Sequence, residues 1–177
     1  NSCDPAHAYK EDFGTGTPDI VSPVNNSIKG STSYHPFSYP SATSTGPNDG
    51  YYALATNTAV IGFNLWQPTL YDHTSGDGKG NFLFFNAGYQ KDVFYEHQFT
   101  GLVVGMFYTF SYWVVNTDPV SSNYINPNIL AQVTDHTTGT VLNYKASGDI
   151  TNSRVWQQIK FTFQATSSSV DLILSNQ

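Results

Sequence analysis

From Tyr51 onward, the chain falls into short segments in which apolar and polar residues alternate with the two-residue period of a β-strand. The clearest segment is 106–116. It predicts two faces, one with Phe107, Thr109, Ser111 and Trp113, the other with Tyr108, Phe110, Tyr112 and Val114. Further strands are expected at 51–56, 128–135, 140–146, 155–165 and 170–176.

Two segments change this picture. Residues 81–89 lack polar alternation, which predicts a strand buried on both faces. In 92–101, Val93, Tyr95, His97 and Phe99 are expected on one face, and Phe94, Glu96 and Gln98 on the other.

The spacing of these segments predicts an all-β fold. The turn at Thr137–Gly139 indicates a hairpin between 129–135 and 141–145, and no segment has a convincing helical period. Residues 14–49 are rich in Pro, Gly, Ser and Thr and are expected to form long loops. We therefore predict one domain over 1–177, a two-sheet antiparallel jelly-roll sandwich.

Composition narrows the class of protein. Only 11% of the residues are charged, aromatic residues make up 15%, and the net charge is −6. The chain has no cluster of Lys and Arg and no apolar run of membrane-spanning length, which argues against nucleic-acid binding and membrane insertion. Cys3 is the only cysteine, so neither an internal disulfide nor a cysteine-based metal site is expected. The chain's first residues read as a mature or excised terminus.

The few acids gather in turns beside predicted strands. The turn 70–81 contains Asp72 and Asp77 among glycines, Glu11 and Asp12 occur together, and Asp49 precedes the strand at Tyr51. Carboxylates and carbonyls of this kind hold calcium, although aspartate also stabilises turns without a metal. Both readings stay open from spacing alone.

A series of short motifs resembles one family. "EDFGTG", "DGYYAL", "DHTSGDGKGNFLFFNAGY", "VFYEHQF", "YTFSYWVVN", "WQQIKFTF" and "SVDLILSN" follow one another from Glu11 to Asn176. This order resembles a jelly-roll module of secreted and surface proteins of the Bacteroidota, such as gliding-motility adhesins and type IX secretion cargo. It is similar to MAM domains and to calcium-bearing carbohydrate-binding modules.

The resemblance implies a structural calcium ion. Glu11 or Asp12 would supply the first ligand, Asp72 matches the aspartate of "DHT", and Asp49 precedes the "GYYAL" strand. The family pattern also continues beyond "LILSN" with a further strand that supplies an aspartate and lies inside a sheet. We therefore expect that strand to come from a longer protein or from another chain.

Catalysis is not expected. The chain contains neither a GxSxG nucleophile motif nor an HExxH zinc motif, and Glu96 and His97 are expected on opposite faces of their strand. Few acids are available for a glycosidase pair, and most lie in turns.

Sugar binding is more plausible, because aromatic rings stack on sugars while amides and imidazoles bind hydroxyls. Trp113 is a further candidate, but Trp113 and Phe110 fit the core better. The Tyr-rich stretch 31–40 is expected to form an adhesive loop. The candidate binding residues are Tyr34, Tyr39, Trp66, Tyr95 and His97.

The sequence therefore predicts a non-catalytic module of a secreted bacterial cell-surface protein, acting in adhesion or glycan binding on a calcium-stabilised sandwich. The alternatives are a structural spacer or secretion-cargo domain without its own ligand, and an accessory module of a polysaccharide-degrading enzyme. The expected partners are a glycan or a surface protein, neighbouring modules, or a strand donated by another chain.

Overall fold

The computed structural model describes residues 9–15, 35–36, 47–61, 65–67, 69–74 and 78–177. This part of the chain forms nine strands and one 3₁₀ turn, Thr58–Val60, and has no α-helix. None of its helices is long and apolar enough to cross a bilayer. The strands are β1 (His35–Pro36), β2 (Tyr51–Ala55), β3 (Phe82–Asn86), β4 (Val93–Thr100), β5 (Phe107–Val114), β6 (Asn128–Asp135), β7 (Val141–Asp149), β8 (Gln157–Gln164) and β9 (Ser169–Asn176).

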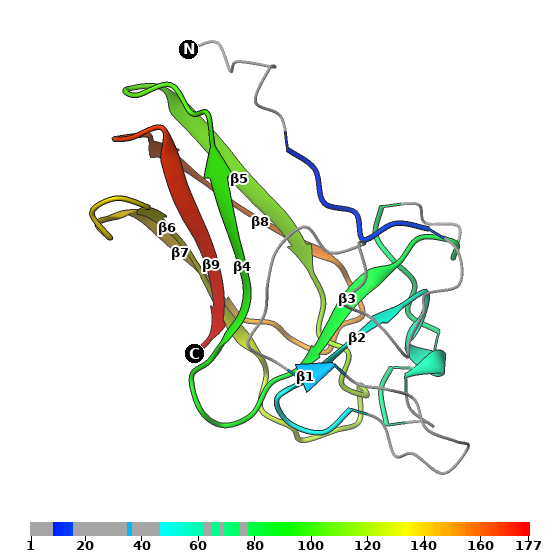
Figure 1. Cartoon of the computed structure of the whole chain (residues 1–177). Helices are drawn as coiled ribbons and strands as arrows, with labels where there is room; N and C mark the ends of the chain where they lie inside the picture. The colour runs from blue at the N-terminus through cyan, green and yellow to red at the C-terminus, as the bar shows by residue number, and fades with distance from the viewer. Residues whose placement is uncertain (1–8, 16–34, 37–46, 62–64, 68, 75–77) are drawn as a thin grey trace.

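The strands form three sheets with the orders β1-β2-β3, β4-β9-β6-β7 and β5-β8. All pairings are antiparallel except that of the two-residue β1, which runs parallel to β2. In Figure 1 the four-stranded sheet lies on one side, and β5, β8, β2 and β3 lie opposite it. The all-β prediction is confirmed as a β-sandwich, whereas the jelly-roll strand order stays a prediction.

The main core lies between these layers. Its buried side chains come from β4, β6 and β9 on one side and from β2 and β8 on the other. Strict alternation creates the inward face of β9, where Val170, Leu172 and Leu174 are buried. Burying such a side chain stabilises the fold by about 1.5–3 kcal/mol.

The burial on both faces that is predicted for the strand at 81–89 is confirmed in part, because Phe82 and Phe84 are buried whereas Leu83 and Phe85 are half-buried. Phe82 and Phe84 belong to a second core cluster with Ala53, Ala55 and Ile61, while Leu83 and Phe85 pack against the main core. Because β3 has packing partners on both faces, apolar residues occupy consecutive positions and the sequence shows no alternation.

The residues predicted for each face of β5 do share a face. The face with Trp113, however, points to solvent and not to the core. Tyr108, Phe110 and Tyr112 pack against the main core, whereas the face that carries Trp113 is exposed to solvent. The expectation that Trp113 is a core residue is therefore wrong: its side chain is 42% exposed.

In β4 the predicted alternation fails at the start of the strand. The pairing with β9 shifts register between Val93 and Tyr95, and both Phe94 and Tyr95 are buried. An extra residue in one strand of an antiparallel pair changes the face on which the following side chains lie. This irregularity places two consecutive aromatic side chains in the core.

The predicted hairpin between β6 and β7 is confirmed, and Asp135 holds its turn. The buried Asp135 carboxylate accepts a hydrogen bond from the Thr166 hydroxyl at 2.5 Å and from the backbone N–H groups of Thr137 and Thr138 at 2.9 and 3.0 Å. These bonds favour the charged form and hold the pKa of Asp135 well below its usual range.

Candidate functional site

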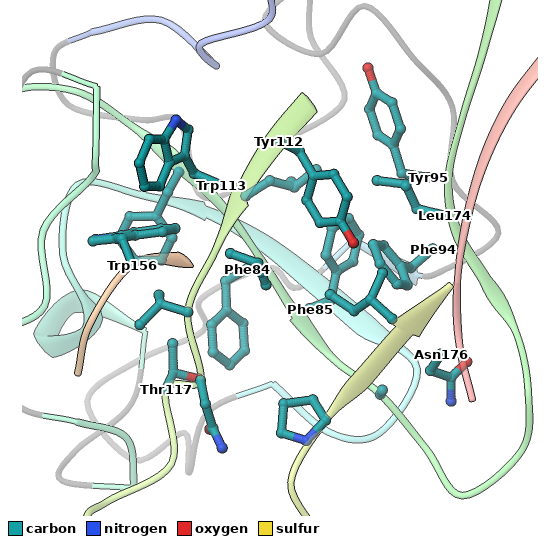
Figure 2. A pocket seen from close by; sticks show the side chains of 18 of the residues that line it. Phe84, Phe85, Phe94, Tyr95, Tyr112, Trp113, Thr117, Trp156, Leu174 and Asn176 are labelled. Atoms are coloured by element: carbon teal, nitrogen blue, oxygen red, sulfur yellow. The ribbon is translucent and has the colours of Figure 1, made fainter. Parts of the chain in front are cut away.

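A large groove opens between β3 and β5. Its volume is about 1820 Å³, and its lining includes every residue of β3 and the run Tyr108–Val114 of β5. Consecutive strand residues point to opposite faces, so a space that touches all of them reaches the edges of both strands. Figure 2 shows the aromatic character of the lining, with Phe84, Phe85, Phe94, Tyr95 and Tyr112 around one space.

A group of three rings lies on the outer face of β5, and we call His73, Trp113 and Trp156 the outer aromatic cluster. His73 and Trp113 are exposed, whereas Trp156 is half-buried against the second core cluster, and all three also line the groove. The rings of His73 and Trp113 stack with centroids 3.6 Å apart and an interplanar angle of 17°, and Trp156 meets His73 edge to face at 6.0 Å. The Trp156 indole N–H donates to the Tyr71 carbonyl at 3.1 Å, which fixes its ring. In Figure 2, Trp113 and Trp156 lie together on one side of β5 and Tyr112 on the other.

The strand pairing places polar side chains beside this cluster. On the outer face of the two-stranded sheet, Trp113 lies opposite Gln158, and the next outward pair is Ser111 and Lys160. All four residues are exposed. The surface therefore combines a flat aromatic ring with hydroxyl, amide and ammonium groups, the combination that sugar recognition requires.

The predicted binding residues do not form one site. Tyr34 and Tyr39 lie outside the described residues. Trp66 lines the groove and packs edge to face on Phe84 at 4.8 Å. Tyr95 is only 6% exposed and belongs to the main core, so its ring has no open face for a sugar.

His97 is in a different place from Trp66. Its half-buried ring stacks on Tyr9 with centroids 4.6 Å apart, and both rings meet Phe99 edge to face. The Tyr9 hydroxyl lies 3.4 Å from that of Tyr95. His97 therefore helps to attach the segment that contains Tyr9 to the face of β4 that also carries Tyr95 and Phe99.

An acidic corner forms where the segment 11–15 passes β3; we define it by Glu11, Asp12, Asp72 and Asn81. Thr15 forms a bridge with Gly80, and Asn81 binds this segment through its backbone N–H, which donates to the Gly14 carbonyl, and its amide Nδ2, which donates to the Phe13 carbonyl. The Asp72 side chain is buried against Gly80, where a Cβ would lie 2.6 Å from its carboxyl carbon. The corner thus has no room for a side chain at Gly80.

Three of the predicted calcium ligands, Glu11, Asp12 and Asp72, belong to the segments that meet at this corner. The Glu11 carboxylate accepts from the Phe13 N–H at 3.0 Å, and the Asp12 carboxylate accepts from the Gly14 N–H at 3.2 Å, so both acids lie in the segment that flanks Gly80. The carbonyl oxygen Oδ1 of Asn81 is buried and has no hydrogen-bond partner. An oxygen of this kind is a suitable ligand for a hard cation.

Two predicted ligands are not brought to the corner. Asp77 lies outside the described residues. Asp49 is exposed and precedes β2, where Tyr51 pairs with Asn86 at the end of β3, whereas Gly80 precedes the start of β3. A five-residue strand spans about 16 Å, so Asp49 and Asp72 cannot bind the same ion. Within the described residues, no group of three or more Asp, Glu, His or Cys side chains forms a metal cluster.

Burial raises the pKa of two titratable groups that line the groove. Loss of hydration raises the pKa of Tyr112 strongly, and its buried hydroxyl has no hydrogen-bond partner. Burial also raises the pKa of Asp118, an effect that its hydrogen bond with Asn116 opposes. Both pKa shifts indicate that the two groups are shielded from water. The Tyr112 hydroxyl in addition lacks a hydrogen-bond partner.

Sequence reasoning missed the outer aromatic cluster. In the sequence, His73 belongs to the "DHT" turn, Trp156 lies in the strand expected at 155–165, and Trp113 is expected in the core. The alternation in 106–116 placed Trp113 with Thr109 and Ser111 on the more polar face. That polarity was the signal that this face points outward.

Comparisons with known proteins give no relative for this chain: no family model, no curated protein and no solved structure matches it.

Proposed function

We propose that this chain is a non-catalytic glycan-binding module of a secreted bacterial surface protein that acts in adhesion. The location and the adhesive role follow from the motif order that resembles Bacteroidota surface modules. The binding role is carried by the outer aromatic cluster, in which Trp113 is 42% exposed although His73 covers one face of its ring. An indole held rigidly in this way stacks on the apolar face of a sugar at little entropic cost.

The neighbouring polar groups give such a site its selectivity. Ser111, Gln158 and Lys160 are exposed beside the indole and offer hydrogen-bond partners for sugar hydroxyls, while the ammonium group also suits an acidic sugar. A module without its own ligand, a spacer or secretion cargo, has no need for an exposed stacked tryptophan.

Native electrophoresis through gels that contain a soluble polysaccharide tests the proposal. A panel of plant, bacterial and mucin-type polysaccharides should include at least one that retards the protein, and Trp113→Ala should abolish the retardation. Phe107→Ala is the matched control, because Phe107 is an exposed aromatic residue on the same face of β5 at its other end. Retardation by none of the polysaccharides, or equal retardation of Trp113→Ala, would favour the spacer.

We also propose that calcium binds at the acidic corner, through Asp72, the Asn81 carbonyl oxygen and Glu11 or Asp12. The buried Asp72 carboxylate and the unpartnered Asn81 oxygen support this choice. The ion would neutralise the acids and tie the segment 11–15 to the start of β3.

Thermal melts distinguish a site at the acidic corner from the ligand set predicted from the sequence, which also includes Asp49. At 100 times its Kd, calcium stabilises the folded state by about 2.7 kcal/mol, which raises the Tm by about 5–10 °C. Asp72→Asn should remove this increase, whereas Asp49→Asn should keep it because Asp49 lies at the other end of β3. No increase in the protein treated with EDTA and then given millimolar calcium would contradict the site.

A further inference from the structure

The outer face of the β5-β8 sheet continues past Trp113 as a surface without acidic residues. Neither β5 nor β8 contains Asp or Glu. Along this face the pair of Trp113 and Gln158 is followed by the pair of Ser111 and Lys160. Two residues along a strand span about 7 Å. Lys160 therefore lies one row of side chains away from the indole that we propose to stack on a sugar.

A second lysine approaches the same place from β7. Asn143 and Lys145 of β7 lie opposite two residues of β6 that are buried in the main core, Val133 and Ala131. Residues that lie opposite each other share a face, so Asn143 and Lys145 are on the face of β7 that is turned to the other layer. The Asn143 amide Nδ2 donates to the Thr162 carbonyl of β8 at 2.7 Å. Lys145, the next residue on that face, is therefore also directed toward β8.

The chain path brings Lys145 level with Lys160. β7 and β9 run in the same direction, because both pair antiparallel with β6. β8 leads into β9 through residues 165–168 and runs opposite to it, so β8 also runs opposite to β7 (Figure 1). The steps from Asn143 to Lys145 and from Thr162 to Lys160 are both two residues long and therefore point the same way. The two lysines thus lie at one level on adjacent strands.

Neither lysine is neutralised by an acid. Both are exposed, and no ion pair in the described part of the chain involves Lys145 or Lys160. The only acid of β7 is Asp149, four residues beyond Lys145, where its carboxylate lies 3.4 Å from the Asn128 amide. Like charges on adjacent strands repel each other, and an anion that contacts both would remove this repulsion. In a chain with a net charge of −6, this is a local positive surface.

We propose that the sugar chain bound at the outer aromatic cluster is acidic, with a carboxylate or sulfate group held by Lys160 and Lys145 while a neighbouring sugar ring stacks on Trp113. This inference rests on the proposed glycan binding and adds the class of glycan. Each ammonium group offers three N–H donors, and hydrogen bonds to charged groups are the stronger ones. The absence of acids from β5 and β8 spares such a ligand the repulsion of an otherwise acidic protein.

Oligosaccharides that carry or lack the charge on one backbone test the class of ligand. Fragments of polygalacturonate, alginate and hyaluronan are compared with their own methyl esters, and sulfated dextran fragments with plain dextran, by isothermal titration calorimetry without added calcium. At least one acidic form should bind about tenfold more tightly than its neutral counterpart, and the pair that responds distinguishes carboxylate from sulfate. Equal affinities in every pair, or binding of neutral forms only, would overturn the proposal.

Lysine variants test where the anion binds. Lys160→Gln and Lys145→Gln should each weaken binding of the acidic form by about three- to tenfold and leave the neutral form unchanged, whereas Lys160→Arg should retain binding. Lys91→Gln is the matched control, because it removes the same charge from an exposed lysine between β3 and β4. Equal weakening by Lys91→Gln would assign the effect to net charge and overturn the site.

The same titrations separate this inference from the proposed function. Neutral and acidic forms that bind equally, lose affinity in Trp113→Ala and keep it in both lysine variants would leave glycan binding standing and overturn the acidic ligand. Absence of binding by any of the oligosaccharides and any of the polysaccharides in the panel would overturn both proposals.

Discussion

The two layers of the sandwich are built from similar residues but differ in completeness. In the four-stranded sheet, every strand has a neighbour, and β9 is paired along its length with β4 on one side and β6 on the other. In the opposite layer, the strand pairing among the described residues ends at β3 and at β5, and the groove with its unpartnered polar atoms lies there. The comparison teaches that apolar residues alone do not complete a sheet, because the edge also needs a backbone partner.

Truncation of one leucine in each layer should give the largest contrast. Leu172→Ala removes a side chain that is 2% exposed within the complete sheet, and it should lower the free energy of unfolding by about 3 kcal/mol. Leu83→Ala, at a half-buried position that lines the groove, should cost about 1 kcal/mol, because the space around it is already open. Urea denaturation measures both, and equal costs would mean that the groove side is packed as closely as the complete sheet.

A second pair of variants tests the acidic corner against the other end of β3. Gly80→Ala should cost about 1–3 kcal/mol, since the new methyl group would collide with the buried Asp72 carboxylate. At Gly88 the nearest atom to a new Cβ, the Asp49 Cβ, is 3.6 Å away, an ordinary contact. Gly88→Ala should therefore change stability by less than about 0.5 kcal/mol in the same denaturation assay. A tolerated Gly80→Ala would show that Asp72 is free to move.

A fall in pH should weaken the stabilisation by Asp135, in the turn after β6, and strengthen the contribution of Asp118, which lines the groove. Asp135 has a lowered pKa in the folded state, so its contribution is present above the unfolded pKa of about 4 and is lost as the pH falls below it. Asp118 has a raised pKa in the folded state, so its contribution is full below the unfolded pKa and is lost as the pH rises through the folded value.

Thermal melts between pH 7 and pH 3 test these signs. Asp135→Asn should lower the Tm by several degrees at pH 7 and by less at pH 3, because at pH 3 the Asp135 carboxyl group is already protonated in the unfolded state and part of its stabilising effect is lost. Asp118→Asn should raise the Tm slightly at pH 7. The exposed Asp149→Asn in β7 serves as the control. An Asp135 variant with the same deficit at every pH would contradict the role of its charge.

The smallest contrast compares two tyrosines on the inward face of β5. The Tyr108 hydroxyl accepts a hydrogen bond from the Val103 N–H at 2.9 Å, whereas the buried Tyr112 hydroxyl has no partner. Tyr108→Phe should cost about 1 kcal/mol, and Tyr112→Phe should be neutral or stabilising by up to about 1 kcal/mol. A substantial loss for Tyr112→Phe in the isolated protein would show that its hydroxyl already has a partner.

Part of the candidate site could be foreseen from the sequence. The "DHTSGDGKG" turn was predicted to gather acids, and the structure places Asp72 beside the segment that contains Glu11 and Asp12. Asp49 could not be excluded in advance, because its distance from Asp72 depends on which end of β3 each turn reaches. Spacing along the chain contains no such information.

The sequence by itself determined the strands, the two faces of β5 and the packing of β3 on both faces, because a two-residue period is a local property of the backbone. Only the tertiary structure decided which face points outward, as for Trp113, and where a register shift turns Phe94 and Tyr95 into the core together. It also showed that, among the described residues, β3 and β5 belong to separate sheets. The physical reason is that local alternation specifies two sides of a strand, whereas the neighbours that cover each side and edge come from distant parts of the polypeptide.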